Sequence, residues 1–277
     1  CISMCLYSVG VLATKFVSMD ALTNASINNS NFGLTGLRAL VTGGGSGIGR
    51  AIADAMINAG ATVVVCDVND STKPNYICDV SKTNDVEAMF AAIERDLGGL
   101  DILVNNVGVP GPTARVDEMD PDAYDECVRI NLGGTFRCTH VAVPMLLKSK
   151  GSIINISTSA GIYGYPLRSP YVAAKWGIIG LTKSWAMELG EFGVRVNAIC
   201  PGSVSGPRMD GVIEREALAT GSTASDIRTG YEKQVSLQTF VDASDIAASA
   251  VFLSSPAARF ITGQVLPVDG NIETMRA

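Results

Sequence analysis

Short apolar runs alternate with longer amphipathic stretches along the chain from about residue 37 onward. The runs are rich in Val and Ile, and most are apolar throughout; they cover residues 38–42, 62–66, 102–105, 152–156, 194–199 and 264–268. Strands that are buried on both faces of a parallel sheet have this character, because neither face meets water. The runs therefore predict the strands of a parallel sheet.

The stretches between the runs have the spacing of amphipathic helices. The first begins near Ile48 and ends before Gly60, a residue suited to a helix C-cap. Four more follow at residues 85–97, 122–147, 171–189 and 245–253. Repeated β-α alternation with right-handed crossovers predicts an α/β fold: a three-layer, doubly wound parallel sheet (Rossmann fold) of about seven strands flanked by helices.

The length and composition fit one such domain. The chain has 277 residues, of which 47% are apolar, and this is enough to bury a full core. We expect a single domain over residues 34–277 and a poorly ordered N-terminal extension over residues 1–33, with a cleaved leader as the alternative. A polar, glycine-containing stretch at about residues 206–239 follows a strand end, and we expect it to act as a mobile lid over the substrate.

Charge and cysteine content narrow the range of partners. A net charge of −6 without a long basic run argues against nucleic acid or an anionic membrane. The seven cysteines form no CxxC pair, which favours buried reduced thiols in a cytoplasmic protein over disulfides or a metal site. The single histidine, His140, lies in a helical stretch, where packing or an interface is the simplest role.

A glycine-rich segment at residues 42–49 joins the first strand to the first helix and reads Thr-Gly-Gly-Gly-Ser-Gly-Ile-Gly. Glycines allow a tight turn and close approach of a ligand, and the free N–H groups of the helix N-terminus attract a pyrophosphate. Asp67 ends the second strand, where a carboxylate accepts hydrogen bonds from the adenosine ribose and repels a 2′-phosphate. The segment therefore predicts a dinucleotide site, and Asp67 favours NAD over NADP.

Tyr171 and Lys175 lie four residues apart at the start of a helix, so both occupy one helical face. Free tyrosine is a poor base at neutral pH, but a neighbouring ammonium favours the phenolate and makes the hydroxyl a better acid/base catalyst. The pair is a candidate proton-transfer site, although the same spacing also occurs on helices without any catalytic role.

Taken together, these motifs resemble the short-chain dehydrogenase/reductase family. The match in order and spacing covers about residues 34–270 and includes 42–49, 105–108, Asn131, 157–161, the Tyr171/Lys175 pair and 201–202. The resemblance implies that Tyr171 is the general acid/base, that Lys175 binds the nicotinamide ribose and favours the phenolate, and that Asn131 holds a water in a proton relay. It implies cofactor contacts from Gly43, Ser46, Gly47, Ile48, Gly49, Asp67, Asp79, Val80, Asn106, Gly108, Tyr171, Lys175, Pro201, Gly202 and Val204.

The chain departs from the family pattern at the catalytic serine. The corresponding position is Thr158, which lies between Ser157 and Ser159. Threonine also offers a hydroxyl to a substrate oxygen, and its methyl group narrows the site. We expect Thr158 to take the serine's role; the alternatives are that Ser157 or Ser159 does so, or that the contact is weaker.

Two arginines near the predicted crevice indicate the kind of substrate. Arg168 precedes Tyr171, and Arg208 opens the 206–239 stretch. Because a guanidinium binds carboxylates in bidentate fashion, we expect a small acidic or polyhydroxylated substrate that also contacts Thr158 and Tyr171. The alternative is that both arginines are surface or interface residues.

The predicted function is an NAD-dependent oxidoreductase that transfers hydride between nicotinamide and a secondary alcohol or ketone, with Tyr171 as general acid/base. A cis-dihydrodiol dehydrogenase and an oxoacyl reductase are the alternatives, followed by a dinucleotide-binding protein without catalysis. The resemblance also implies a homo-oligomer, a tetramer or dimer, that pairs through the helices at 122–147 and 171–189.

Overall fold

The computed structural model of the chain describes residues 31–272, the side chain of Ala219 excepted. Residues 1–30 of the predicted N-terminal extension therefore lie outside the described residues. In the described part, no helix is both long and apolar enough to cross a membrane.

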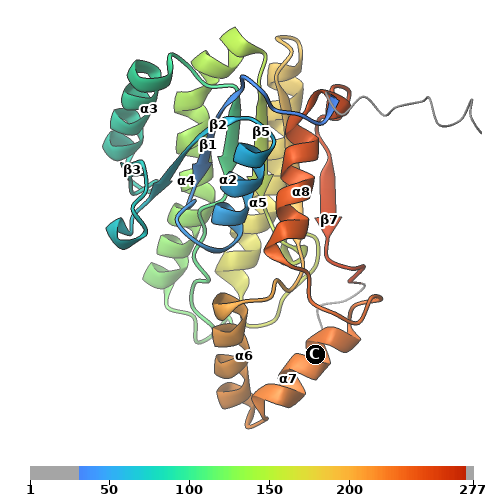
Figure 1. Cartoon of the computed structure of the whole chain (residues 1–277). Coiled ribbons are helices and arrows are strands. Elements are labelled where there is room, and N and C mark those ends of the chain that lie inside the picture. Colours follow the sequence, from blue (N-terminus) through green and yellow to red (C-terminus); the bar gives the residue numbers. More distant parts are fainter. Residues whose placement is uncertain (1–30, 273–277) are drawn as a thin grey trace, which may run out of the picture.

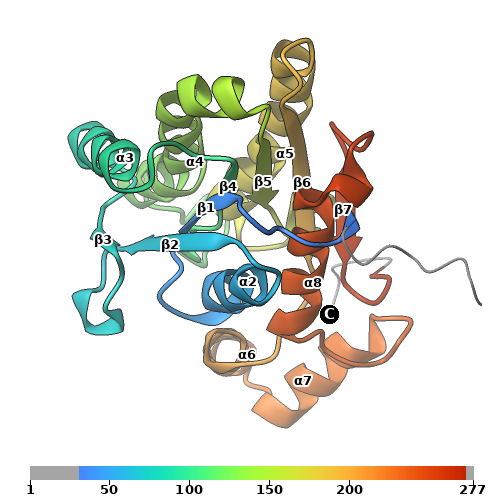
Figure 2. The same cartoon turned by 45° about the horizontal axis from the view of Figure 1, so that its top comes forward.

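The centre of the fold is a parallel sheet of seven strands in the order β3-β2-β1-β4-β5-β6-β7, seen along its edge in Figure 2. The chain winds outward from β1 to β3 and then returns to the other side of β1, so the strand order reverses between β1 and β4. The strands are β1 (Arg38–Thr42), β2 (Thr62–Asp67), β3 (Tyr76–Ile77), β4 (Ile102–Asn105), β5 (Ser152–Ile156), β6 (Arg195–Pro201) and β7 (Val265–Val268). This is the predicted doubly wound sheet, and ligands bind such sheets at the reversal point, outside the carboxyl ends of the strands.

Helices cover both faces of the sheet and make two separate cores (Figures 1 and 2). One face packs against α3 (Thr83–Leu97), α4 (Pro121–Ser149) and α5 (Ser169–Gly190), and the other against α2 (Gly47–Asn58) and α8 (Ala243–Ser254). Neighbouring strand residues alternate between the cores: Leu40, Leu103 and Ile153 join the first, whereas Val41, Val104 and Ile154 join the second. Because both faces are buried, the strands are continuously apolar in sequence.

A buried polar ladder fixes the carboxyl ends of β4 and β5 between two helices. Asn105 Nδ2 donates to Thr139 Oγ1 of α4 at 3.0 Å and to Asn155 Oδ1 of β5 at 2.9 Å. Asn155 Nδ2 donates in turn to Thr182 Oγ1 of α5 at 2.9 Å. Hydrogen bonds between buried groups are costly to break, so the ladder holds α4 and α5 in register beside the strand ends.

The predicted lid stretch contains two helices, α6 (Pro207–Thr220) and α7 (Ala224–Lys233). Figure 1 shows them beyond the end of the sheet, outside the three layers. They share a small core of their own, in which Ile213, Tyr231 and Phe240 are buried. The remaining short turns of helix are η2 (Asp70–Thr72), η3 (Ser159–Gly161) and η4 (Pro256–Ala258).

The five cysteines in the described residues are buried, as predicted. His140 is exposed on α4, and its ring stacks on Phe136 with the centroids 5.8 Å apart. This contact agrees with the packing or interface role expected for the histidine.

Candidate active site

The glycine-rich turn packs closely at Gly49, where no side chain would fit. A Cβ atom on Gly49 would lie 2.2 Å from the carbonyl oxygen of Gly43, whose own φ is +62°. Asn106 Nδ2, at the end of β4, donates to the carbonyl oxygens of Thr42 at 3.0 Å and Gly43 at 3.1 Å. The turn is therefore rigid, and it brings β1 and the amide of Asn106 to the start of α2.

The N-terminus of α2 lies open at this turn. Ser46 is the N-cap, but its side chain makes no capping bond, and the first turn of α2 contains no acidic residue within the described structure. The first N–H groups of a helix have no partners inside the helix and carry a partial positive charge. They fit an anionic group supplied by a ligand, and Gly47, Ile48 and Gly49 are the residues that would meet it.

Asp67 borders the same turn at the carboxyl end of β2. Its Oδ2 accepts a hydrogen bond from the Gly45 N–H at 3.2 Å, and its Oδ1 accepts from the Asn69 N–H at 3.1 Å. These bonds fix the carboxylate beside the turn, in the place expected for an acceptor of ribose hydroxyls.

Asp79 and Val80 follow β3, the edge strand next to β2. Burial tends to raise the pKa of Asp79, but hydrogen bonds from the Ser81 hydroxyl at 2.6 Å and the Ser81 N–H at 3.0 Å hold it below its usual value. The Asp79 carboxylate therefore stabilises the turn at residues 79–81. Val80 is buried and packs against Gly134 of α4.

Tyr171 and Lys175 lie one turn apart at the start of α5, with Lys175 Nζ 5.8 Å from the centroid of the Tyr171 ring. Pro170 in the first turn fixes where this helix begins. Lys175 is 3% exposed, and its Nζ donates to the carbonyl oxygen of Ile156 at 2.9 Å. Burial, with a smaller contribution from the Arg208 guanidinium, lowers the pKa of Lys175 to about 7.

The three hydroxyls at 157–159 have different partners. Ser157 Oγ donates to the Lys175 carbonyl at 2.9 Å, and Ser159 Oγ donates to Asp269 Oδ2 at 3.0 Å; both side chains are buried. Thr158 is partly exposed, and its Oγ1 makes one long contact of 3.4 Å to the Pro201 carbonyl. Of the three hydroxyls, that of Thr158 is the most available to a substrate.

Asn131 and Gly108 lie behind Lys175. Asn131 Nδ2 donates to the carbonyls of Val109 at 3.1 Å and Cys127 at 2.8 Å, whereas its buried Oδ1 has no partner among the described residues. A Cβ atom on Gly108 would lie 2.8 Å from that oxygen and 3.3 Å from Lys175 Nζ. Glycine at this position lets the backbone approach both the amide and the ammonium.

The two arginines reach the same loop after β4. Arg168 Nη2 donates to the Pro110 carbonyl at 2.7 Å, and Arg208 Nη1 donates to the Gly108 carbonyl at 3.1 Å. Arg168 is buried, with its guanidinium 5.1 Å from the centroid of the Tyr171 ring, whereas Arg208 is exposed. The surface alternative is therefore wrong for Arg168, and both cations lie beside the Tyr171/Lys175 pair.

The loop after β6 completes the site. Pro201 is the last residue of β6, and Val204 forms an isolated parallel bridge with Val241. A Cβ atom on Gly202 would lie 2.7 Å from the Cβ atom of Asp269. Asp269 supports this loop and was not among the site residues predicted from the sequence. Its position beside Gly270 marks a turn, but nothing local indicates a bond to Ser159.

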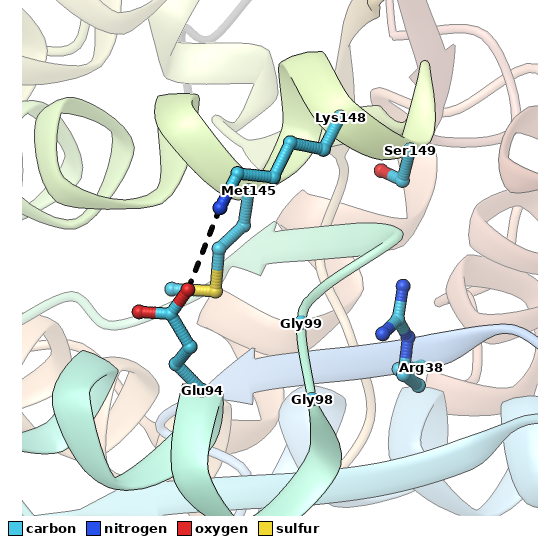
Figure 3. Close-up of a pocket in the computed structure, with 7 residues that line it drawn as sticks. All are labelled: Arg38, Glu94, Gly98, Gly99, Met145, Lys148 and Ser149. Carbon is cyan, nitrogen blue, oxygen red and sulfur yellow. Dashed lines mark ion pairs between the residues drawn. The ribbon is translucent and has the colours of Figure 1, made fainter.

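A hollow at the opposite end of the sheet is unrelated to this site (Figure 3). It is lined by Arg38, the first residue of β1, by Gly98 and Gly99 before β4, and by the ion pair of Lys148 Nζ with Glu94 Oε1 at 3.5 Å. Because these residues precede the strands, the hollow lies at the amino ends, away from the strand reversal that gathers Tyr171, Lys175 and the glycine-rich turn.

Comparison with known proteins agrees with this geometry. A family model described as enoyl-(acyl carrier protein) reductase matches residues 43–271. The chain is 38% identical over 254 residues to a D-beta-hydroxybutyrate dehydrogenase of Cupriavidus necator, covering 86% of this chain and 98% of that protein. It is 34% identical, with coverage of 86% and 97%, to a 2,5-dichloro-2,5-cyclohexadiene-1,4-diol dehydrogenase of Sphingobium indicum.

A solved structure, NAD+-bound xylitol dehydrogenase, has the same fold. The two structures superpose with a TM-score of 0.81 at 28% identity, covering 86% of this chain and 99% of the other.

Proposed function

This chain belongs to the short-chain dehydrogenase/reductase family and is an alcohol dehydrogenase/ketoreductase acting on CH–OH groups, and we propose that it uses NAD and a substrate that carries a carboxylate. The observation that carries the proposal is the placement of the buried Arg168 against Tyr171, beside Lys175 and the loop after β4. A buried cation at the proton-transfer site is costly unless an anion or hydrogen-bond acceptors meet it.

The described residues fit the cofactor. The open N-terminus of α2 would hold the pyrophosphate, and Asp67 would accept hydrogen bonds from the adenosine ribose and disfavour a 2′-phosphate. The remaining length of the dinucleotide would lie along Gly43, Asp79, Val80, Asn106 and the 201–204 loop. When bound, NAD supplies the hydride acceptor.

The chain's own residues handle the proton. In the oxidation direction, Tyr171 Oη takes the proton of the substrate hydroxyl, and the Lys175 ammonium stabilises the phenolate. Thr158 Oγ1 donates a hydrogen bond to the substrate oxygen. Asn131 holds a water behind Lys175, through which the proton leaves, because its buried Oδ1 lies close to the ammonium and lacks a partner in the described structure.

The two arginines bind the acidic end of the substrate. Arg168 is held against the rings of Tyr165 and Tyr171, while the exposed Arg208 of α6 is free to swing from the Gly108 carbonyl to an incoming carboxylate. The name of the Cupriavidus necator relative, which acts on a hydroxy acid, supports this class. With α6 and α7 lying over the site as a lid, Arg208 stays beside the loop after β4 and water is excluded.

A second candidate substrate class is a polyol or cyclic diol. The names of the Sphingobium indicum relative and of the xylitol dehydrogenase structure favour it. In that case the arginines would donate hydrogen bonds to hydroxyls, and a net negative charge on the substrate would not matter for affinity.

We further propose that copies of the chain pair through α4 and α5. Phe136 and His140 present a stacked, exposed pair on α4, and Trp176 is half exposed on α5. Exposed aromatic residues of this kind are typical of interfaces.

The test of the function is a screen of NAD-linked oxidation over hydroxy acids, polyols and cyclic diols, read at the NADH absorbance band. We expect hydroxy acids to give the highest kcat/KM and NADP to replace NAD poorly. A protein that oxidises only neutral, apolar alcohols would overturn the substrate proposal, and one that binds NAD but oxidises nothing would overturn the enzymatic one.

A further inference from the structure

Three side chains join α6 and α7 to the segment that precedes the catalytic helix. Tyr231 of α7 donates its hydroxyl hydrogen to Glu216 Oε2 of α6 at 2.6 Å. The Tyr231 hydroxyl oxygen also lies 2.5 Å from that of Tyr165, which belongs to the segment between η3 and α5. Since Tyr231 gives its own hydrogen to the carboxylate, Tyr165 is the donor in the second bond.

This chain of hydroxyls is shielded from water at its centre. Tyr231 is buried and packs edge-on against Phe240, with the ring centroids 6.5 Å apart. Burial raises the pKa of Tyr165 and of Tyr231, so both hydroxyls remain protonated and able to donate. Hydrogen bonds that end on a carboxylate are stronger than neutral ones, so the three groups hold one arrangement.

Tyr165, at the other end of this series of hydrogen bonds, contacts Arg168. Its guanidinium carbon lies 5.5 Å from the centroid of the Tyr165 ring and 5.1 Å from that of Tyr171. The guanidinium is held in place by its hydrogen bond to the Pro110 carbonyl and by these two rings. Its buried Nε has no partner within the described structure. A displacement of the Tyr165 ring would therefore displace the cation from its place beside Tyr171.

We propose that Glu216, Tyr231 and Tyr165 form a latch that holds α6 and α7 against the catalytic segment and positions Arg168 for the anionic end of the substrate. The latch rests on the proposed role of Arg168 in binding an acid. Its members are positioning residues: they set the affinity for an anionic substrate and leave the proton transfer at Tyr171 unchanged.

The experiment compares Tyr231→Phe and Tyr165→Phe with the wild type, since phenylalanine keeps the ring and removes only the hydroxyl. The substrates are the hydroxy acid that the wild type oxidises best, starting with 3-hydroxybutyrate, and its neutral amide. We expect KM for the acid to rise roughly tenfold, with kcat and the KM for the amide within about twofold. The double variant is expected to have the same KM as either single variant, because each change breaks the same series of hydrogen bonds.

Two further variants sharpen the result. Glu216→Gln keeps an acceptor oxygen without the charge and is expected to raise KM less than Tyr231→Phe does. Tyr163→Phe is the matched control, because the Tyr163 hydroxyl makes no hydrogen bond in the described structure, and it is expected to behave as the wild type.

Limited trypsin digestion gives a readout that needs no turnover. Arg215, Arg228 and Lys233 are cleavage sites in α6 and α7. Trypsin cuts a helical site only after the helix unfolds locally, and loss of the latch makes this unfolding easier, so Tyr231→Phe is expected to be cut there faster than Tyr163→Phe.

The outcomes separate the latch from the function on which it rests. A wild type that oxidises no hydroxy acid overturns the proposed substrate class. If the wild type oxidises hydroxy acids, an unchanged acid-to-amide KM ratio in both Tyr variants overturns the latch alone, as does a fall in kcat at constant KM.

Discussion

Replacing Lys175 by methionine should change how the stability of the cofactor-free protein depends on pH. Lys175 is almost fully buried, and burial lowers the pKa of its ammonium from 10.5 to about 7. Between these values the unfolded chain binds a proton that the folded chain does not, so the free energy of unfolding rises with pH. The cost of burying the charge is complete below about pH 7 and vanishes above the ordinary pKa of lysine.

The size of the effect follows from the two pKa values. The ionisation of Lys175 destabilises the fold by about 4 kcal/mol at pH 7 and by about 2 kcal/mol at pH 9. The Lys175→Met variant lacks this contribution at both pH values. Its stability advantage over the wild type should therefore shrink by about 2 kcal/mol between pH 7 and pH 9, whatever constant difference the lost bond to the Ile156 carbonyl adds.

Urea denaturation of both proteins at the two pH values measures this difference. Lys183→Met is the matched control, since it removes an exposed lysine from the same helix. If the two proteins differ in free energy of unfolding by the same amount at pH 7 and pH 9, the lowered pKa of Lys175 is refuted. A difference that grows from pH 7 to pH 9 would mean that the pKa of Lys175 is raised instead.

The remaining predictions concern the cofactor and the substrate oxygen. Asp67→Ser should weaken NAD binding about tenfold and improve NADP binding in fluorescence titrations; an unchanged NAD/NADP ratio would contradict the role of the carboxylate. Gly49→Ala should abolish NAD binding and lower the free energy of unfolding by at least about 1–3 kcal/mol, because its methyl group meets the Gly43 carbonyl; Gly190→Ala, with open space around it, is the control. Thr158→Ala should lower kcat about 10²-fold and Thr158→Ser should retain it; unchanged turnover in Thr158→Ala would assign the contact elsewhere.

Much of the fold follows from local sequence. The runs at 38–42, 102–105 and 152–156 agree with the observed strands to the residue, because burial on both faces leaves a continuous apolar signal. The two-residue β3 was not among the predicted runs, since Tyr76–Ile77 is too short to show any periodicity. The helices α6 and α7 lie inside the stretch expected to be a mobile lid, for which no helices were predicted, although Pro207 in the first turn and Gly221 at the C-cap mark the ends of α6.

The site was predictable where residues belong to one turn or one helix. The glycine-rich turn and the Tyr171/Lys175 pair are of this kind, since the residues that act together are neighbours in sequence. Contacts between distant segments were not predictable: Tyr165 meets Tyr231 across 66 positions, and Ser159 meets Asp269 across 110. No local pattern encodes these pairs, because they depend on how the helices beyond the sheet fold back on the strand ends.

The comparison of Tyr171→Phe with the wild type tests the central claim most directly. Both are assayed for NAD-linked oxidation of the preferred hydroxy acid, and NADH affinity is measured by fluorescence as a check on the cofactor site. Loss of the hydroxyl should lower turnover by about 10²–10⁴-fold while the NADH affinity stays within about twofold. A Tyr171→Phe variant that keeps turnover within about tenfold of the wild type would contradict proton transfer by this residue.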